Sequence, residues 1–169
     1  MTGKKLCLGT FILVFGVIII GNLAAQTDRN LNGTWVCNEY ESQREFMLNN
    51  GNFEMSDVRR DVSSFLRGTF TANNGILTIR TTHTMWLGGD IEKFGLVSGR
   101  WYTYDEQLNA TKNFLLKEGM PENEINEYIK TSSSLSQCTY SIVSSSLILT
   151  DTHTFNGETF TNTCVYTRK

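Results

Sequence analysis

The chain of 169 residues contains a single proline and no surplus of positive charge, because 15 Lys and Arg residues face 17 Asp and Glu residues. A nucleic-acid-binding domain concentrates basic residues on one face, so this balance argues against a nucleic-acid partner. With 14 glycines and 11% aromatic residues, the composition also excludes a collagen-like or disordered chain. The length suits one compact domain rich in tight turns.

One long apolar run occurs, and it lies at the N-terminus. Lys4 and Lys5 precede the apolar residues 6–20, and small residues follow in 21–25. A basic start, a short apolar run and small residues are typical of a signal peptide. A membrane helix needs about 20 apolar residues, so the length favours cleavage over anchoring. We expect a signal peptide at 1–25 and a secreted or periplasmic mature domain at 26–169 without a membrane span.

Cleavage would remove Cys7 and leave Cys37, Cys138 and Cys164. An odd number of cysteines in an oxidising compartment indicates one disulfide and one free thiol. Their spacing matches no zinc-binding pattern, and we expect neither a metal nor another cofactor.

Past the leader, apolar and polar residues alternate between Asn-Gly turns, which is typical of antiparallel hairpins. The turns are at 49–51, 73–75 and 156–157, and Ser144–Ser146 favours a fourth. The predicted strands are 33–41, 44–49, 52–58, 64–72, 76–86, 136–143, 147–155 and 158–168.

Residues 87–135 break this alternation. Residues 105–118 have helical spacing and end at Gly119, and a second helix is expected from Pro121, with Ile125, Tyr128 and Ile129 on one face. We predict an insertion of two short amphipathic helices in an otherwise all-β domain.

An internal repeat relates two hairpins at an offset of 70 residues. It aligns Leu77 with Leu147, and Thr82-His83-Thr84 with Thr152-His153-Thr154. The two hairpins are therefore expected to be equivalent, although threonine-rich strands also resemble one another by chance.

The opening strand Gly33-Thr34-Trp35-Val36 resembles the Gly-x-Trp strand of lipocalin-like (calycin) proteins, and Val165-Tyr166-Thr167-Arg168 resembles their last strand. The chain is also similar to small secreted lipocalin-like proteins of spirochaetes over about residues 30–86 and 136–169. The insertion lies outside this pattern. The resemblance implies structural roles for Gly33, Trp35 and Arg168, with the arginine stacked over the tryptophan at the closed end of a barrel.

The fold prediction is therefore an all-β, eight-stranded, antiparallel up-and-down barrel with a two-helix insertion between strands five and six. Alternation predicts the inward-facing residues. They are Trp35, Cys37, Phe46, Leu48, Phe53, Met55, Gly68, Phe70, Leu77, Ile79, Tyr140, Ile142, Leu147, Leu149, Phe160, Cys164 and Tyr166.

Strand directions place the insertion at the open end of this barrel, where its helices could form a lid. Closing the first strand on the last brings Cys37 near Cys164, whereas Cys138 lies two strands from Cys164. This geometry favours a Cys37–Cys164 disulfide and a free Cys138.

Eight residues are candidates for ligand binding, either beneath this lid or on the inner wall. They are Phe70, His83, Met85, Trp86, Tyr140, Asp151, His153 and Phe155. The histidines could orient a polar group of the ligand, or they could be hydrogen-bonded polar residues at a wet rim. The backbones of residues on strands two apart are about 10 Å from each other, so His83 and His153 are too far apart to bind one metal. Trp86 could cover a ligand or pack the inserted helices.

No Gly-x-Ser-x-Gly, His-Glu-x-x-His, phosphate-loop or dinucleotide motif occurs, so we expect no enzyme. A thiol or metal enzyme would need a base or a further ligand from the insertion. The favoured function is an exported barrel that binds a small hydrophobic molecule in its cup. The alternative is a filled barrel that acts as a protein-interaction module, such as a protease inhibitor or host-surface binder, through residues 87–135.

Overall fold

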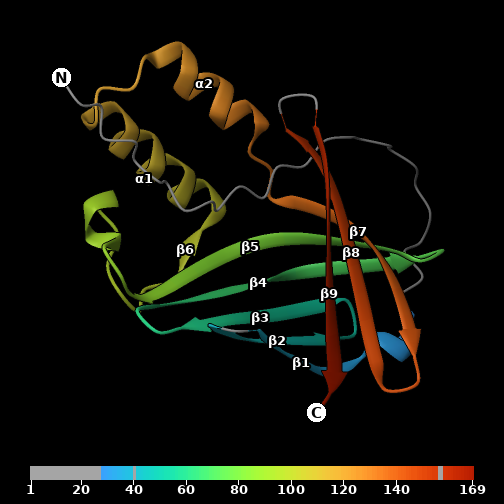
Figure 1. Ribbon diagram of the computed structural model, residues 1–169. Coiled ribbons are helices and arrows are strands. Elements are labelled where there is room, and N and C mark those ends of the chain that lie inside the picture. The colour runs from blue at the N-terminus through green and yellow to red at the C-terminus, as the bar shows by residue number, and fades with distance from the viewer. Residues whose placement is uncertain (1–27, 40, 156–157) are drawn as a thin grey trace.

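The computed structural model describes residues 28–39, 41–155 and 158–169, and for residues 131, 153–155 and 158 it describes the backbone alone. The chain forms an antiparallel sheet that closes into a barrel through pairing of its fourth and fifth strands (Figure 1). This confirms the predicted eight-stranded barrel. The expected signal peptide lies outside the described residues.

Eight strands form the barrel wall: β1 (Gly33–Glu39), β2 (Ser42–Asn49), β3 (Asn52–Arg59), β4 (Val62–Asn73), β5 (Ile76–Gly88), β7 (Leu135–Val143), β8 (Ser146–Phe155) and β9 (Glu158–Arg168). The insertion contains η2 (Ile91–Phe94), the short strand β6 (Tyr102–Thr103), α1 (Tyr104–Lys117) and α2 (Glu122–Thr131), while η1 (Arg29–Leu31) precedes β1. The two predicted helices therefore lie between the fifth and sixth wall strands, as expected.

The hairpin turns follow from residues that tolerate a positive φ. Asn50 and Gly51 have φ of 47° and 82°, and Asn74 and Gly75 have φ of 50° and 76°. Two successive residues in this region give the turn that matches the twist of antiparallel strands. Ser144 turns the β7–β8 hairpin at φ 56°. The Asn156-Gly157 turn lies outside the described residues.

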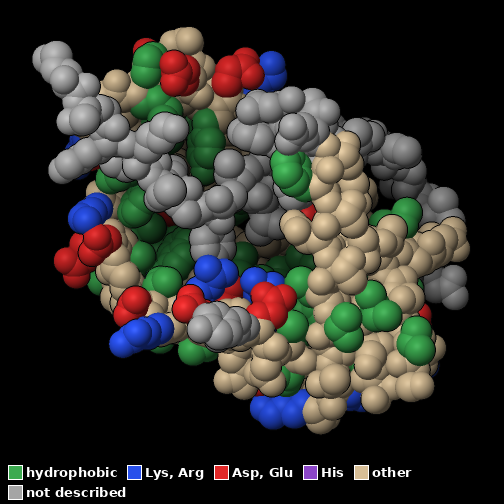
Figure 2. All heavy atoms as spheres, in the orientation of Figure 1, with side chains coloured by type: hydrophobic (Ala, Val, Ile, Leu, Met, Phe, Trp, Pro, Cys, Tyr) green, Lys and Arg blue, Asp and Glu red, His purple; other side chains and the backbone are tan. Residues whose placement is uncertain are grey.

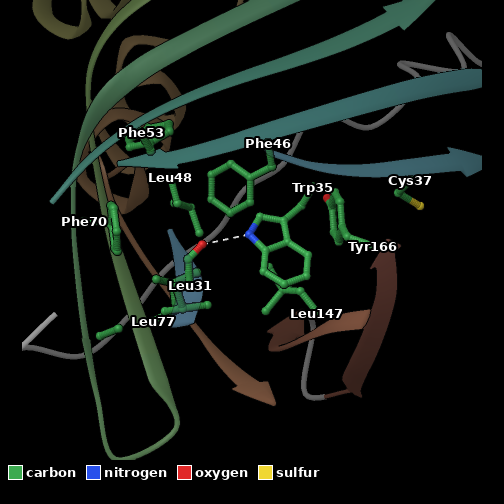
Figure 3. Close-up of a cluster of buried hydrophobic side chains, with 11 residues drawn as sticks. Leu31, Trp35, Cys37, Phe46, Leu48, Phe53, Phe70, Leu77, Leu147 and Tyr166 are labelled. Carbon is green, nitrogen blue, oxygen red and sulfur yellow. Dashed lines mark hydrogen bonds between the residues drawn. The ribbon is translucent and has the colours of Figure 1, made fainter. Parts of the chain in front are cut away.

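The closed end of the barrel is filled by a cluster that we call the plug. Its side chains, drawn in Figure 3, are 4% exposed or less. The Trp35 indole N–H donates to the Leu31 carbonyl at 2.8 Å, which ties η1 across the end of the barrel. The Arg168 guanidinium lies 4.5 Å from the centre of the Trp35 ring. The plug consists of Leu31, Trp35, Phe46, Leu48, Phe53, Phe70, Ala72, Leu77, Leu147 and Tyr166.

A β-bulge in β5 reverses which residues face inward. Arg67 pairs with His83 but Gly68 pairs with Thr81, so Thr82 is an extra residue. Beyond it, Thr84 is buried opposite Leu66, which packs against the core. Because neighbours on a strand face opposite ways, His83 lies on the outer face.

Two expectations are therefore corrected. His83 and Met85 do not face inward, because Thr84 between them does. The repeat of the two hairpins also ends here, because among the described residues β8, the counterpart of β5, pairs with β7 only up to Thr150 and has no pair equivalent to Arg67–His83.

The upper part of the β8–β9 hairpin separates from the wall. In the described chain, β9 pairs with β1 only at Trp35–Arg168 and Val36–Thr167, and β8 pairs with β7 only up to Thr150. The hairpin continues beyond both points towards the side of the helices (Figure 1). Phe160, expected inside, is consequently 42% exposed.

Candidate functional site

The open half of the barrel is less completely filled than the plug. Four inward-facing side chains there pack against the core yet remain partly exposed: Met55, Leu66, Ile79 and Leu149. Figure 2 shows hydrophobic side chains in a recess between the helices and the barrel wall, with acidic and basic side chains at its lower lip. We call the inner surface of this open half, which includes Met55, Leu66, Ile79 and Leu149, the cup.

A buried carboxylate organises one wall of the cup. The Asp57 side chain is 7% exposed and lies between two guanidinium groups. Arg59 donates to it from Nη2 at 2.9 Å, and Arg44 donates from Nε at 3.4 Å. A buried charge is tolerated when it is paired and hydrogen-bonded, so Asp57 holds both arginines on the wall.

The upper rim of the same wall brings a second carboxylate next to two thiols. Glu39 Oε1 lies 3.9 Å from Cys37 Sγ and 3.8 Å from Cys164 Sγ. Glu39 Oε2 lies 3.5 Å from Arg44 Nη2, and Arg44 Nη1 lies 3.5 Å from Cys164 Sγ. Arg44 therefore links Asp57, on one side, to Glu39 and Cys164 on the other.

The expected Cys37–Cys164 disulfide is not formed, because Cys37, Cys138 and Cys164 are all free thiols in this structure. The strand register gives the reason. Within the residues that the structure describes, β9 pairs with β1 only at Trp35–Arg168 and Val36–Thr167, so Cys37 and Cys164 are not opposite each other in the paired segment of the two strands.

The thiols and the phenol inside the barrel are neutral at physiological pH. Burial is the largest cause that raises the pKa of Cys138 to about 12, and the charges of Asp151 and Cys164 contribute to the same shift. Burial is also the largest cause of the raised pKa values of Cys37, Cys164 and Tyr166. A protonated thiol is a poor nucleophile, so these groups contribute packing and weak hydrogen bonds.

The insertion covers one side of the mouth. Thr84, on the inner face of β5, donates to Gln107 Oε1 of α1 at 3.3 Å. Trp86 packs with a small core in the insertion, formed by Ile91, Leu96 and Tyr102. The structure thus gives Trp86 the packing role that the sequence left open. A capping box between Thr103 and Glu106 fixes the start of α1.

The other predicted site residues are dispersed. Phe70 belongs to the plug, and Tyr140 donates to Asp28 Oδ2 at 3.2 Å at the closed end. His83 contacts Thr82 on the outer face through Nδ1. Asp151 lies near Cys138 inside the barrel. The side chains of residues 153 and 155, and hence the predicted roles of His153 and Phe155, lie outside the description.

Sequence analysis missed the four charged side chains of the cup. Glu39, Arg44, Asp57 and Arg59 share the inward alternation of the apolar residues on their strands. Extending that alternation to the strand ends would have identified them.

A separate cavity of about 560 Å³ opens at the closed end. Its lining is largely polar and consists of Asp28, Asn30, Tyr140, Ile142, Ser144, Ser145 and Arg168. Its lining includes none of the side chains that form the cup.

Within the described residues, no helix has the length and hydropathy of a membrane span. In the same part of the chain, no three His, Cys, Asp or Glu side chains are grouped to hold a metal ion. Comparison with protein-family models, curated proteins and solved structures gave no match to this chain.

Proposed function

We propose that the chain is an exported, lipocalin-like barrel that binds a small, largely apolar molecule in its cup. The observation that carries the proposal is the difference in filling along the barrel axis. Plug side chains are 4% exposed or less, whereas inward-facing Met55, Leu66, Ile79 and Leu149 are only partly buried. Accessible apolar surface inside a rigid wall is what small-molecule sites offer.

The architecture limits the ligand to the upper half of the barrel. Burial of apolar surface against the cup would supply about 25 cal/mol per Å². The insertion shields one side of the mouth through the Thr84–Gln107 contact. The basic start and apolar run within residues 1–25 support export, and a secreted or periplasmic location is part of the proposal.

The first experiment is mass spectrometry of residues 26–169 purified after export. A small-molecule mass that is retained under native conditions and lost on denaturation is the expected result. The second is titration with 11-(dansylamino)undecanoic acid, a fluorescent probe with a long apolar chain. We expect the wild-type protein to bind it.

Met55→Trp provides the variant for that titration, because Met55 faces the cup from β3. The larger ring should occupy the cup and weaken probe binding at least tenfold. Glu54→Trp is the matched control, since Glu54 is exposed on the opposite face of the same strand. Equal binding by both variants, with both folded by circular dichroism, would contradict binding in the cup.

The alternative function, a protein-interaction module, has one observation in its favour. Val97, Leu116 and Tyr128 expose apolar surface on the insertion. An interaction module predicts that no small molecule is retained and that Met55→Trp has no effect on partner binding, whereas Leu116→Glu reduces it.

A further inference from the structure

The Arg44 guanidinium is enclosed, and its contacts with carboxylates are long. Its side chain is 23% exposed, and its carboxylate contacts are at 3.4 Å to Asp57 and 3.5 Å to Glu39. Charge-assisted bonds between a guanidinium and a carboxylate are normally about 2.7–2.9 Å long. Burial lowers the pKa of Arg44, but Glu39, Tyr166, Asp57 and Cys164 raise it by more, so the group remains a cation.

The two acidic partners of Arg44 differ in how firmly they are held. Asp57 is almost fully buried and is fixed by Arg59 at 2.9 Å. Glu39 is 45% exposed and is the last residue of β1. Its other contacts are two thiols at 3.8 and 3.9 Å, which are weak partners for a carboxylate. Glu39 can therefore move into solvent at little cost, whereas Asp57 cannot.

Arg44 also lies where the charged part of the inner wall meets its apolar part. The strand register places Cys37, Arg44 and Asp57 in one row across the wall. The next row towards the plug contains Trp35, Phe46 and Met55. A group bound to Arg44 would therefore lie directly beside the apolar floor of the cup.

We propose that Arg44 anchors the anionic head of an amphipathic ligand, and that Glu39 is the internal group which this head displaces. This inference rests on the proposed ligand-binding function and names the class of ligand: a monoanion, such as a carboxylate, with an apolar body. The ligand head replaces a long contact to Glu39 by a short, bidentate one to the guanidinium. The charge around Arg44 is unchanged by the exchange, because one anion leaves as another arrives.

The test compares two probes with the same apolar chain, one with a charged head and one with a neutral head: 11-(dansylamino)undecanoic acid and its methyl ester. We expect the wild-type protein to bind the acid about tenfold more tightly than the ester. Arg44→Gln should bring this ratio close to one and leave ester binding unchanged. Glu39→Gln should strengthen binding of the acid about threefold and leave ester binding unchanged. Arg80→Gln is the control, because Arg80 is exposed and pairs with the outward-facing Thr69.

The outcomes separate this inference from the function on which it rests. Failure of the wild-type protein to bind either probe would contradict both. Equal binding of acid and ester would contradict the role of Arg44 and leave a cup for neutral ligands. If Arg44→Gln does not fold, the proposal is tested with Glu39→Gln, whose site is exposed. An acid-to-ester affinity ratio equal to that of the wild-type protein would then overturn the proposal.

Discussion

The two halves of this barrel are made by the same alternation of residues and yet have opposite properties. In the plug, large aromatic and aliphatic side chains meet across the barrel, and Phe46 contacts both Phe53 and Tyr166. In the cup, inward positions near the strand ends carry Glu39, Arg44 and Asp57 instead. Alternation thus determines which side chains face inward, while their size and charge determine whether the interior is solid or accessible. Stability should therefore reside mainly in the plug.

The largest expected effect comes from truncating the plug. Trp35→Ala removes a fully buried ring and its hydrogen bond to Leu31, and should lower the free energy of unfolding by about 3–5 kcal/mol. Met55→Ala, in the accessible cup, should cost less than about 2 kcal/mol because the site is already partly solvated. Urea unfolding followed by fluorescence or circular dichroism measures both. Equal losses would show that the two halves do not differ in stability.

The next largest effect on stability is expected at the β-bulge of β5, where Gly68 of β4 lies close to the backbone of β5. A Cβ atom at Gly68 would lie 2.0 Å from the Arg80 carbonyl oxygen, so Gly68→Ala must push β4 away from β5. We expect a loss of about 3 kcal/mol in unfolding free energy.

Gly95→Ala is the matched control for this close approach. Gly95 has a φ of 72°, and a Cβ atom added there would meet nothing within 4 Å, so only the backbone conformation should cost about 1 kcal/mol. A smaller loss for Gly68→Ala than for Gly95→Ala would show that the bulge is not sterically required.

Within the cup, the buried carboxylate should matter more than the exposed one. Asp57→Asn leaves two arginines without their shared counter-ion, and we expect a loss of about 2 kcal/mol, moderated by the partial exposure of Arg44 and Arg59. Glu39→Gln should change stability by less than about 0.5 kcal/mol, because surface ion pairs contribute little. Thermal unfolding of the two variants measures both stability losses. A larger loss for Glu39→Gln than for Asp57→Asn would contradict the role of Glu39 as a displaceable group.

Much of the fold could be predicted because short-range rules determine it. The Asn-Gly turns and the two-residue period placed the strands within a few residues of their observed ends, and Gly119 and Pro121 separated the helices. Most of the plug followed from the same alternation, but Leu31 and Ala72 were not predicted to belong to it. These features depend on neighbours along the chain, which the sequence displays directly.

The cup was harder to predict because it depends on contacts between distant strands. One extra residue, Thr82, moved His83 from the inner to the outer face, and no local pattern marks that bulge. The pairing of β1 with β9 likewise ends at Val36–Thr167 and does not include Cys37 or Cys164. The charged wall was not predicted because Arg44 meets Asp57 and Glu39 across strands, and no local pattern displays these contacts.

A pH-dependent effect on stability tests the position of Cys138 at the boundary between the two halves. Burial raises its pKa to about 12, against an ordinary value of 9.0, so the folded state keeps the thiol protonated while the unfolded state ionises. The resulting stability is present below about pH 9 and is lost between pH 9 and 12. From pH 8 to pH 10, the wild-type protein should lose about 1 kcal/mol more unfolding free energy than Cys138→Ala. Urea titrations at both pH values measure this difference, and parallel losses in the two proteins would place Cys138 in the solvated cup rather than against the plug.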